Sequence, residues 1–224
     1  MSKKDNITKG KITGIIANLV VVEADGPVQQ NEICYILQED SRLMAEVIKV
    51  MGESAYIQAF ESTRGLRVGD QVEFAGHMLE VNLGPGILSR NYDGLQNDLD
   101  RMEGLFLKRG AQTDALDHEK KWEYKPLASE GDKVSAGDWL GEVTENWLPH
   151  KIMVPFKLEG KYTVKSLASE GEYTIDDTIA VLTDEDDREI EVTMVQQWPV
   201  KIPIKNYREK PRPFKLLETG IRTI

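Results

Sequence analysis

A glycine-rich turn, Gly84-Pro85-Gly86, follows an apolar run in the sequence, and a second turn, Asp93-Gly94, comes shortly after it. Turns of this kind between a strand and a helix can bind phosphate, because their backbone N–H groups point at the anion. Pro85 has no N–H to offer, and Ile87-Leu88 stand where a phosphate-binding loop carries Lys and Ser or Thr. No G-x-x-x-x-G-K-[ST] motif occurs in the chain. We therefore predict a rigid turn at which the chain crosses between domains and packs against one of them.

The other side chains that could do chemistry are isolated from one another in the sequence. Cys34 is the single cysteine, and with no histidine near it we predict a partly buried strand thiol rather than a nucleophile. The acidic run Asp184–Asp187 lacks the ligand spacing and the glycine of a calcium loop, which favours a solvated turn. Three histidines stand singly, as is typical of surfaces and turns: His77, His118 and His150. The sequence thus predicts no catalytic, cofactor-binding or metal-binding residue.

Composition and charge narrow the class of protein. The 224 residues are 40% hydrophobic and 29% charged, as in soluble globular domains, and no apolar run approaches the roughly 20 residues of a membrane span. The net charge is −10, and residues 111–192 alone hold 9 basic and 20 acidic side chains, a net charge of −11. Such an acidic segment repels phosphate backbones, so nucleic acid is not an expected partner. One cysteine and the lack of a signal-peptide core after Met1 favour a reducing compartment.

The first 80 residues have the pattern of short strands separated by tight turns. Gly-containing pairs such as Gly52-Glu53 and Gly69-Asp70 predict the turns. Five or six short strands leave exposed edges in a flat sheet, whereas a closed barrel removes those edges. We predict a small β-barrel over residues 1–80, built on the apolar or alternating runs Ile12–Val22, Ile33–Leu37, Leu43–Met51 and Tyr56–Phe60.

A helix and an extended segment are expected on either side of a second domain. Apolar residues at spacings of four, three and four predict a linking helix within residues 81–110, with Asp93 as its N-cap and Gly110 at its end. Four prolines from residue 199 onward predict an extended, basic segment within 193–224. The apolar face of the predicted helix consists of Leu95, Leu99, Met102 and Phe106.

An internal repeat lies between these two segments. LASEG occurs at Leu127–Gly131 and again at Leu167–Gly171, with Glu130-Gly131 and Glu170-Gly171 at the two turns. Each copy has the pattern strand, turn, apolar residue, acidic turn and strand, which predicts the two matching halves of a pseudo-two-fold β sandwich. The pattern resembles biotinyl and lipoyl carrier domains, which present a modifiable lysine on the hairpin between their halves. Lys151 is near that position but out of register, so the resemblance is taken as architectural.

Several motifs in a fixed order carry a second resemblance. They are GKITGIIANLVVVE, AEVIKVMGESAYIQAFESTRGLRVGDQV, LEVNLGPGILSRNYDGLQNDL, WPVKIP at Trp198–Pro203 and RPFKLLETGIRTI at Arg212–Ile224. Together they resemble the N-terminal region of the catalytic alpha chain, or A subunit, of V-type (archaeal or vacuolar-type) ATP synthases, in which an inserted bulge domain stands where the repeat lies. The resemblance gives structural roles to Gly84, Pro85, Gly86, Tyr92, Asp93, Gly94 and Gln96.

This resemblance implies a mainly β fragment of a larger subunit. Its parts would be a barrel at 1–80, a linker and helix at 81–110 beside a nucleotide-binding domain, a bulge at 111–192, and a lead-in at 193–224 to a P-loop domain beyond Ile224. The P-loop, the catalytic Glu and bound Mg-ATP or ADP would then belong to the full-length subunit, and this chain alone would not be an enzyme.

The same resemblance implies partners and a location. Three A subunits would alternate with three B subunits in a ring that binds central and peripheral stalk subunits and couples ATP turnover to proton or sodium transport. The barrel would serve ring assembly, and the acidic bulge suits stalk docking. The chain would lie in the cytoplasm, peripheral to the membrane and without insertion into it.

Three alternatives of other classes stay open at this point. The first is a biotinyl- or lipoyl-like carrier modified at Lys151. The second is a stand-alone protein-binding module that uses its barrel, although the acidic balance disfavours polymer binding. The third is the N-terminal region of a non-catalytic paralogue or of another ring ATPase.

Overall fold

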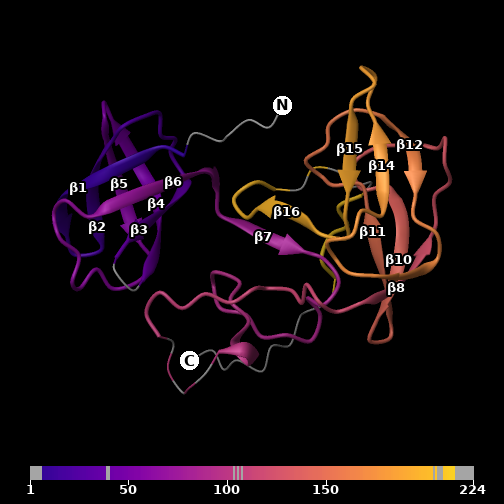
Figure 1. Ribbon diagram of the computed structural model, residues 1–224, viewed down its shortest axis with the longest axis horizontal. Coiled ribbons are helices and arrows are strands. Elements are labelled where there is room, and N and C mark those ends of the chain that lie inside the picture. The colour runs from indigo at the N-terminus through magenta and orange to yellow at the C-terminus, as the bar shows by residue number, and fades with distance from the viewer. Residues whose placement is uncertain are drawn as a thin grey trace.

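The structure, a computed structural model, has two β domains at opposite ends of the molecule, joined by a two-stranded ribbon (Figure 1). The first domain is a closed barrel, and the second is a sandwich of two four-stranded sheets. The predicted fold class, mainly β with a barrel and a sandwich, is confirmed. Residues 215–224 of the last sequence motif and residues 103, 105 and 107 of the predicted helix lie outside the described part. The structure describes residues 7–38, 41–102, 104, 106, 108–203, 205 and 209–214.

Six antiparallel strands form the barrel. They are β1 (Lys9–Ile16), β2 (Leu19–Ala24), β3 (Glu32–Leu37), β4 (Arg42–Met51), β5 (Ser54–Ala59) and β6 (Gln71–Met78). Alternation of apolar side chains builds the core: Val20 and Val22 of β2 are fully buried, whereas Glu23 is exposed. The order β1-β2-β5-β4-β3-β6 closes on itself, so each strand has two hydrogen-bonded neighbours. Cys34 is a strand thiol in β3, as predicted, but it is fully rather than partly buried, and burial raises its pKa above the ordinary value.

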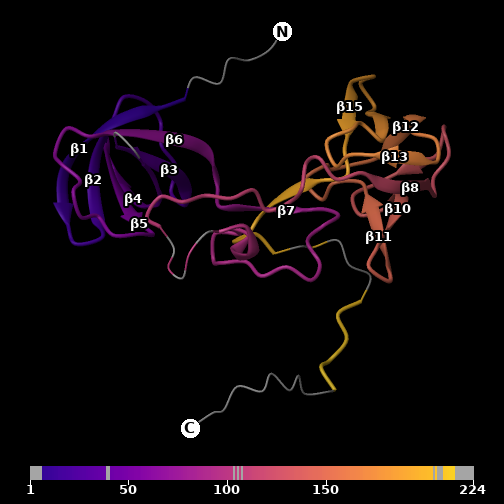
Figure 2. The same cartoon turned by 60° about the horizontal axis from the view of Figure 1, so that its bottom comes forward.

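The ribbon that leaves the barrel also receives the chain when it returns. Strand β7 (Glu80–Leu83) pairs with β16 (Gln196–Pro199) in antiparallel register, so that Gln196 lies opposite Leu83. Residues 84–195 are therefore inserted between two paired strands, and both ends of the insertion meet at this ribbon (Figures 1 and 2).

The predicted linking helix is wrong. Among the described residues of 93–110, the structure has one short 3₁₀ turn, η1 (Leu99–Arg101). Positive φ angles at Gln96 (63°) and Gly104 (98°) interrupt any continuous right-handed helix. Asp93 accepts hydrogen bonds from the backbone N–H groups two and four residues on, but it does so within a loop. The apolar residues do have helical spacing, but the hydrogen bonds and positive φ angles of local turns give this segment a loop conformation instead.

The sandwich is built from eight strands. They are β8 (Trp122–Pro126), β9 (Lys133–Val134), β10 (Trp139–Glu145), β11 (Leu148–Met153), β12 (Tyr162–Leu167), β13 (Gly171–Tyr173), β14 (Ala180–Thr183) and β15 (Glu189–Val192). One sheet has the order β11-β10-β8-β13 and the other β15-β14-β12-β9. Each half of the repeat thus lends a short strand to the other half's sheet: β9 pairs with β12, and β13 pairs with β8. The two halves bury one shared core that includes Tyr124, Leu140, Val164, Ile179 and Leu182.

Candidate functional site

The junction loop, residues 84–98, lies where the ribbon meets the sandwich. Gly84 and Pro85 are buried at its start. A Cβ on Gly84 would lie 3.0 Å from Val195 Cγ2 and 3.2 Å from both Leu116 Cδ1 and the Met194 carbonyl oxygen. The side-chain-free residue therefore lets the outgoing and returning chains pack closely at the base of the sandwich.

The turn does bind an anion, and that anion is a side chain of the same protein. Glu145, at the end of β10, is 2% exposed, and its Oε1 accepts hydrogen bonds from the N–H of Gly86 at 2.8 Å and of Leu88 at 2.9 Å. His150 Nδ1, on β11, donates to the other carboxylate oxygen at 2.6 Å. Gly86 has a φ of 102°, a backbone conformation that favours glycine. In this conformation its N–H points at the Glu145 carboxylate. The N–H groups that a phosphate would need are already in use.

The side-chain amide of Gln96 forms hydrogen bonds with the backbone of strand β7 in the ribbon. Its Oε1 accepts a hydrogen bond from the N–H of Asn82 at 2.7 Å, and its Nε2 donates to the Asn82 carbonyl oxygen at 2.8 Å. Asn82 lies opposite Gln197 of β16 in the ribbon. The amide of Gln96 therefore pairs with β7 as a further strand would, and satisfies backbone groups on the edge that β16 leaves free.

Asp93 organises the tight turn inside the loop. Its carboxylate accepts hydrogen bonds from the N–H of Leu95 at 2.9 Å, and from the N–H and the side-chain amide of Asn97, both at 2.8 Å. Burial raises the pKa of Asp93, but these hydrogen bonds outweigh it and hold the pKa below the ordinary value. Gly94 faces open space, since a Cβ there would meet nothing within 4 Å.

Tyr92 and Asp98 close the loop through an isolated β-bridge. The Tyr92 hydroxyl donates to the Ala115 carbonyl oxygen at 2.7 Å, and burial, with a smaller contribution from the Asp98 charge, raises the pKa of Tyr92. The Asp98 side chain is 2% exposed and lies 3.6 Å from Arg90 Nη1 and 3.5 Å from Arg101 Nε. Two guanidinium groups therefore compensate for one buried carboxylate.

The repeat turns lie in the sandwich itself and tie its halves together. The N–H of Gly131 donates to the Val164 carbonyl oxygen of the other half at 2.8 Å. Gly171 pairs in register with Tyr124 of the first half. The sequence repeat matches Tyr124 with Val164, so the two contacts are reciprocal. The glutamate of each turn is exposed.

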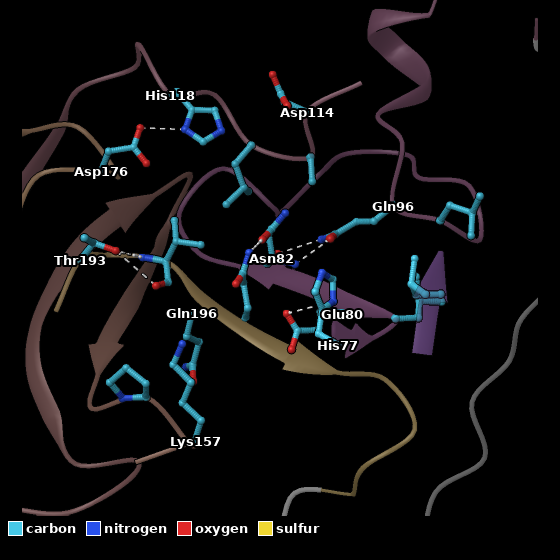
Figure 3. A pocket seen from close by; sticks show the side chains of 18 of the residues that line it. His77, Glu80, Asn82, Gln96, Asp114, His118, Lys157, Asp176, Thr193 and Gln196 are labelled. Atoms are coloured by element: carbon cyan, nitrogen blue, oxygen red, sulfur yellow. Dashed lines mark hydrogen bonds and ion pairs between the residues drawn. The ribbon is translucent and has the colours of Figure 1, made fainter. Parts of the chain in front are cut away.

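A cavity of about 730 Å³ lies between the barrel, the junction loop and the sandwich (Figure 3). His77 Nδ1 lies 3.9 Å from a Glu80 carboxylate oxygen, and His118 Nδ1 lies 2.8 Å from Asp176 Oδ2. Figure 3 shows the two histidines on separate elements, each turned toward its own acid. Within the described residues, no group of three or more His, Cys, Asp or Glu side chains is placed to hold a metal ion. The cavity is therefore lined by hydrogen-bonding side chains from the barrel, the junction loop and the sandwich.

Lys151 does not have the geometry of a carrier lysine. It lies within β11, where its Nζ forms an ion pair with Glu142 and sits 4.8 Å from the centre of the Trp139 ring. The tip of the β10–β11 hairpin is Asn146-Trp147, and Trp147 is 80% exposed. The side chain presented at the tip is thus an indole instead of an amine.

Glu145 is the residue of this site that sequence reasoning missed. A usable signal was present, because Val143 and Glu145 occupy inward positions of the alternating strand β10. A carboxylate at an inward position must find donors, since an unpaired buried charge is strongly unfavourable. Its partners lie 57 and 59 residues away in the chain, and no local pattern identifies them.

Comparison with known proteins gives a consistent answer for both domains. The model described as "ATP synthase alpha/beta family, beta-barrel domain" matches residues 12–76, and that described as "ATPsynthase alpha/beta subunit barrel-sandwich domain" matches residues 113–201. The V-type ATP synthase alpha chain of Treponema denticola is 46% identical over 220 residues, which is 97% of this chain and 37% of that protein. This chain belongs to the ATP synthase alpha/beta family. The protein of the same name from Borrelia hermsii is 45% identical over 96% of this chain and 38% of its own length.

Membership of the ATP synthase alpha/beta family confirms the resemblance drawn from the motifs. The chain spans less than two fifths of the length of these relatives. The junction loop falls between the two matched domains and so belongs to the connection between them. Among the helices of the described residues, none is long and apolar enough to cross a membrane.

Proposed function

We propose that this chain is the assembly region of the alpha chain of a V-type ATP synthase, the A subunit that hydrolyses or makes ATP. The observation that carries the proposal is the 46% identity over 97% of the chain to a protein named V-type ATP synthase alpha chain. The two family domains follow each other along the chain, which supports the same assignment. In this proposal the P-loop, the catalytic Glu and Mg-ATP or ADP belong to the rest of the full-length subunit.

The barrel would join neighbouring subunits in a ring in which A subunits alternate with B subunits. Closure leaves its strand edges paired, so contacts with a neighbour must be made by side chains. Two large apolar side chains on its surface suit such contacts, namely Ile16, which is 67% exposed, and Val68, which is 68% exposed.

The sandwich would dock a stalk subunit. Residues 111–192 hold 20 acidic and 9 basic side chains, so a basic partner surface would be attracted to it. The β14–β15 hairpin carries the acidic run Asp184–Asp187, and it projects from the sandwich away from the ribbon (Figure 1). The complex would lie at the cytoplasmic membrane surface and couple ATP turnover to proton or sodium transport.

The gene sequence that follows Ile224 is the most direct test of this assignment. A P-loop within the next few dozen residues is expected. A different domain there would contradict the proposal and would favour a stand-alone module or another ring ATPase.

The two domain roles are tested on the full-length protein mixed with B and stalk subunits. Val68→Asp is expected to reduce the yield of the alternating ring in native mass spectrometry, whereas Leu127→Asp, which places the same charge on the sandwich, leaves it unchanged.

Deletion of residues 111–192 is expected to abolish stalk binding and coupling while the ring still forms. Retained stalk binding would remove the docking role.

The carrier alternative has its own test. Mass spectrometry of the cell-expressed chain is expected to show an unmodified Lys151, because its Nζ is already paired with Glu142. A biotinyl or lipoyl adduct on this lysine would establish the alternative.

A further inference from the structure

The sandwich is carried on a narrow neck. The chain enters it through β7 and leaves it through β16, and these two paired strands run from the barrel side to its base (Figures 1 and 2). A two-stranded ribbon is a weak support by itself. The ring of Trp198 on β16 packs edge-on against Phe156 of the sandwich, and Gln196 Oε1 accepts a hydrogen bond from the Phe156 N–H at 3.0 Å. Contacts that lie beyond the neck must therefore help to hold the orientation of the sandwich.

Glu145 makes such a contact directly after the neck. The carboxylate reaches from strand β10 of the sandwich to the first turn after β7, where it accepts the N–H groups of Gly86 and Leu88. Beside it, Asn146 Nδ2 donates to Ser89 Oγ at 3.1 Å. His150 holds the second carboxylate oxygen, so the side chain has little rotational freedom. The contact joins the end of the neck to the middle of the inserted domain.

We propose that Glu145 is a positioning residue: a tethered carboxylate that occupies the anion-binding turn at residues 84–88 and braces the sandwich against rotation on its neck. Releasing the turn would leave the buried Oε1 of Glu145 without its two donors and two backbone N–H groups without an acceptor. The unpaired carboxylate oxygen and the two unpaired N–H groups would all oppose pivoting, so the brace holds one orientation. This role is independent of the complex to which the chain belongs.

The first test measures the turn itself, in this 224-residue chain. Glu145→Ala is expected to speed amide exchange at Gly86 and Leu88 by at least about tenfold in residue-resolved NMR. Glu145→Gln should give a smaller increase, since its amide oxygen still accepts from both N–H groups. Glu142→Ala is the matched control, because Glu142 lies on the same strand and pairs with Lys151 instead. It is expected to leave both amides unchanged.

Formate separates an anion site from simple loss of packing. The alanine variant leaves space for a small carboxylate, so added formate is expected to slow exchange at Gly86 and Leu88 again. The same formate should leave the wild-type rates unchanged. If exchange rises in Glu145→Ala but formate restores nothing, the anion-site part of the proposal is wrong.

The second test measures the orientation of the sandwich. Spin labels at Val68→Cys and Asp186→Cys, in a Cys34→Ala background, report the distance between barrel and sandwich. A single narrow distribution is expected with Glu145 or with Glu142→Ala, and a broad one with Glu145→Ala. A distribution that stays narrow in Glu145→Ala would overturn the brace. If that variant fails to fold, Glu145→Leu decides, because leucine keeps most of the side-chain volume but accepts no hydrogen bond, and an unbroadened distribution there would also count against the brace.

Discussion

The barrel and the sandwich solve the same problem of covering a small β-core in different ways. In the barrel, closure gives each strand two backbone-paired neighbours. The sandwich has four sheet edges, at β11, β13, β15 and β9, and holds its halves together through reciprocal contacts such as Gly131 with Val164. The barrel thus closes through strand pairing alone, whereas the two halves of the sandwich are joined by a few backbone hydrogen bonds and by the side chains of one shared core. The consequences of substitution should differ accordingly.

The largest effect is expected at Gly141 of the sandwich, which packs directly against Tyr124. A Cβ there would lie 2.2–2.4 Å from ring atoms of the fully buried Tyr124. Gly141→Ala should therefore lower the free energy of unfolding of the sandwich by about 3 kcal/mol, as overpacking of a core does. Calorimetry should show the sandwich transition shifting down while the barrel transition stays. Gly14→Ala in the barrel is the control, since its Cβ would meet Val21 at an ordinary 3.7 Å.

The second half of the repeat suggests the rescue for that variant. Val164 occupies the position of Tyr124 in the repeat, and Ala180 occupies that of Gly141. The pair Tyr124→Val with Gly141→Ala copies this combination and should recover part of the lost stability. A double variant less stable than Gly141→Ala alone would show that the clash is not the cause.

The stability of the two domains should start to fall at different alkaline pH values, because each domain buries a different titratable group. Burial raises the pKa of Tyr124 from 10.0 to about 12, and burial also raises the pKa of Cys34 above its ordinary 9.0. The stabilising contribution of a raised pKa is complete below the unfolded-state value and is lost as the pH rises above it. The barrel should therefore start to weaken above pH 9, and the sandwich above pH 10, where it loses about 2–3 kcal/mol by pH 12.

Two conservative variants assign these alkaline losses. Cys34→Ala should remove the dependence of the barrel transition between pH 9 and 10, and Tyr124→Phe that of the sandwich above pH 10. Thermal melts across this range measure both. Equal shifts of both transitions in either single variant would contradict the assignment of each group to its own domain.

The two regions also differ in how far the sequence predicts them. The barrel follows from alternation within single strands, as at Val20 and Val22, together with the requirement that edges be paired. The repeat predicts the sandwich, because matching positions such as Tyr124 and Val164 fall on matching strands. The junction loop fails this logic: the spacing of Leu95 and Leu99 is helical, but Gln96 takes a φ of 63° to reach Asn82. Glu145 bonds to a turn 57–59 residues away, and such a partner is not encoded in any local period.

A smaller effect is expected in the junction loop, which neither domain encloses. Asp93→Ala removes the acceptor for Leu95 and Asn97 and should cost about 1–2 kcal/mol. The pKa of Asp93 is lowered in the folded chain, so its contribution is present above the ordinary value of 3.8 and is lost as the pH falls through the folded-state pKa. Urea unfolding at neutral and at acid pH measures the difference, which should shrink in acid. Asp100→Ala, which removes an exposed acid in the adjoining 3₁₀ turn η1, should change neither value.

The last prediction is that this 224-residue chain does not bind nucleotide. The Gly84-Pro85-Gly86 turn has the composition of a phosphate site, but Pro85 has no N–H, and Glu145 already accepts the N–H groups of Gly86 and Leu88. A phosphate would have to displace a carboxylate that is held by His150 and tethered to its own strand. Calorimetric titration with Mg-ATP should therefore give no binding heat. Measurable affinity that disappears in a Gly86→Ala chain would locate a nucleotide at this turn, and would mean that the turn and the brace are alternatives instead of one fixed junction.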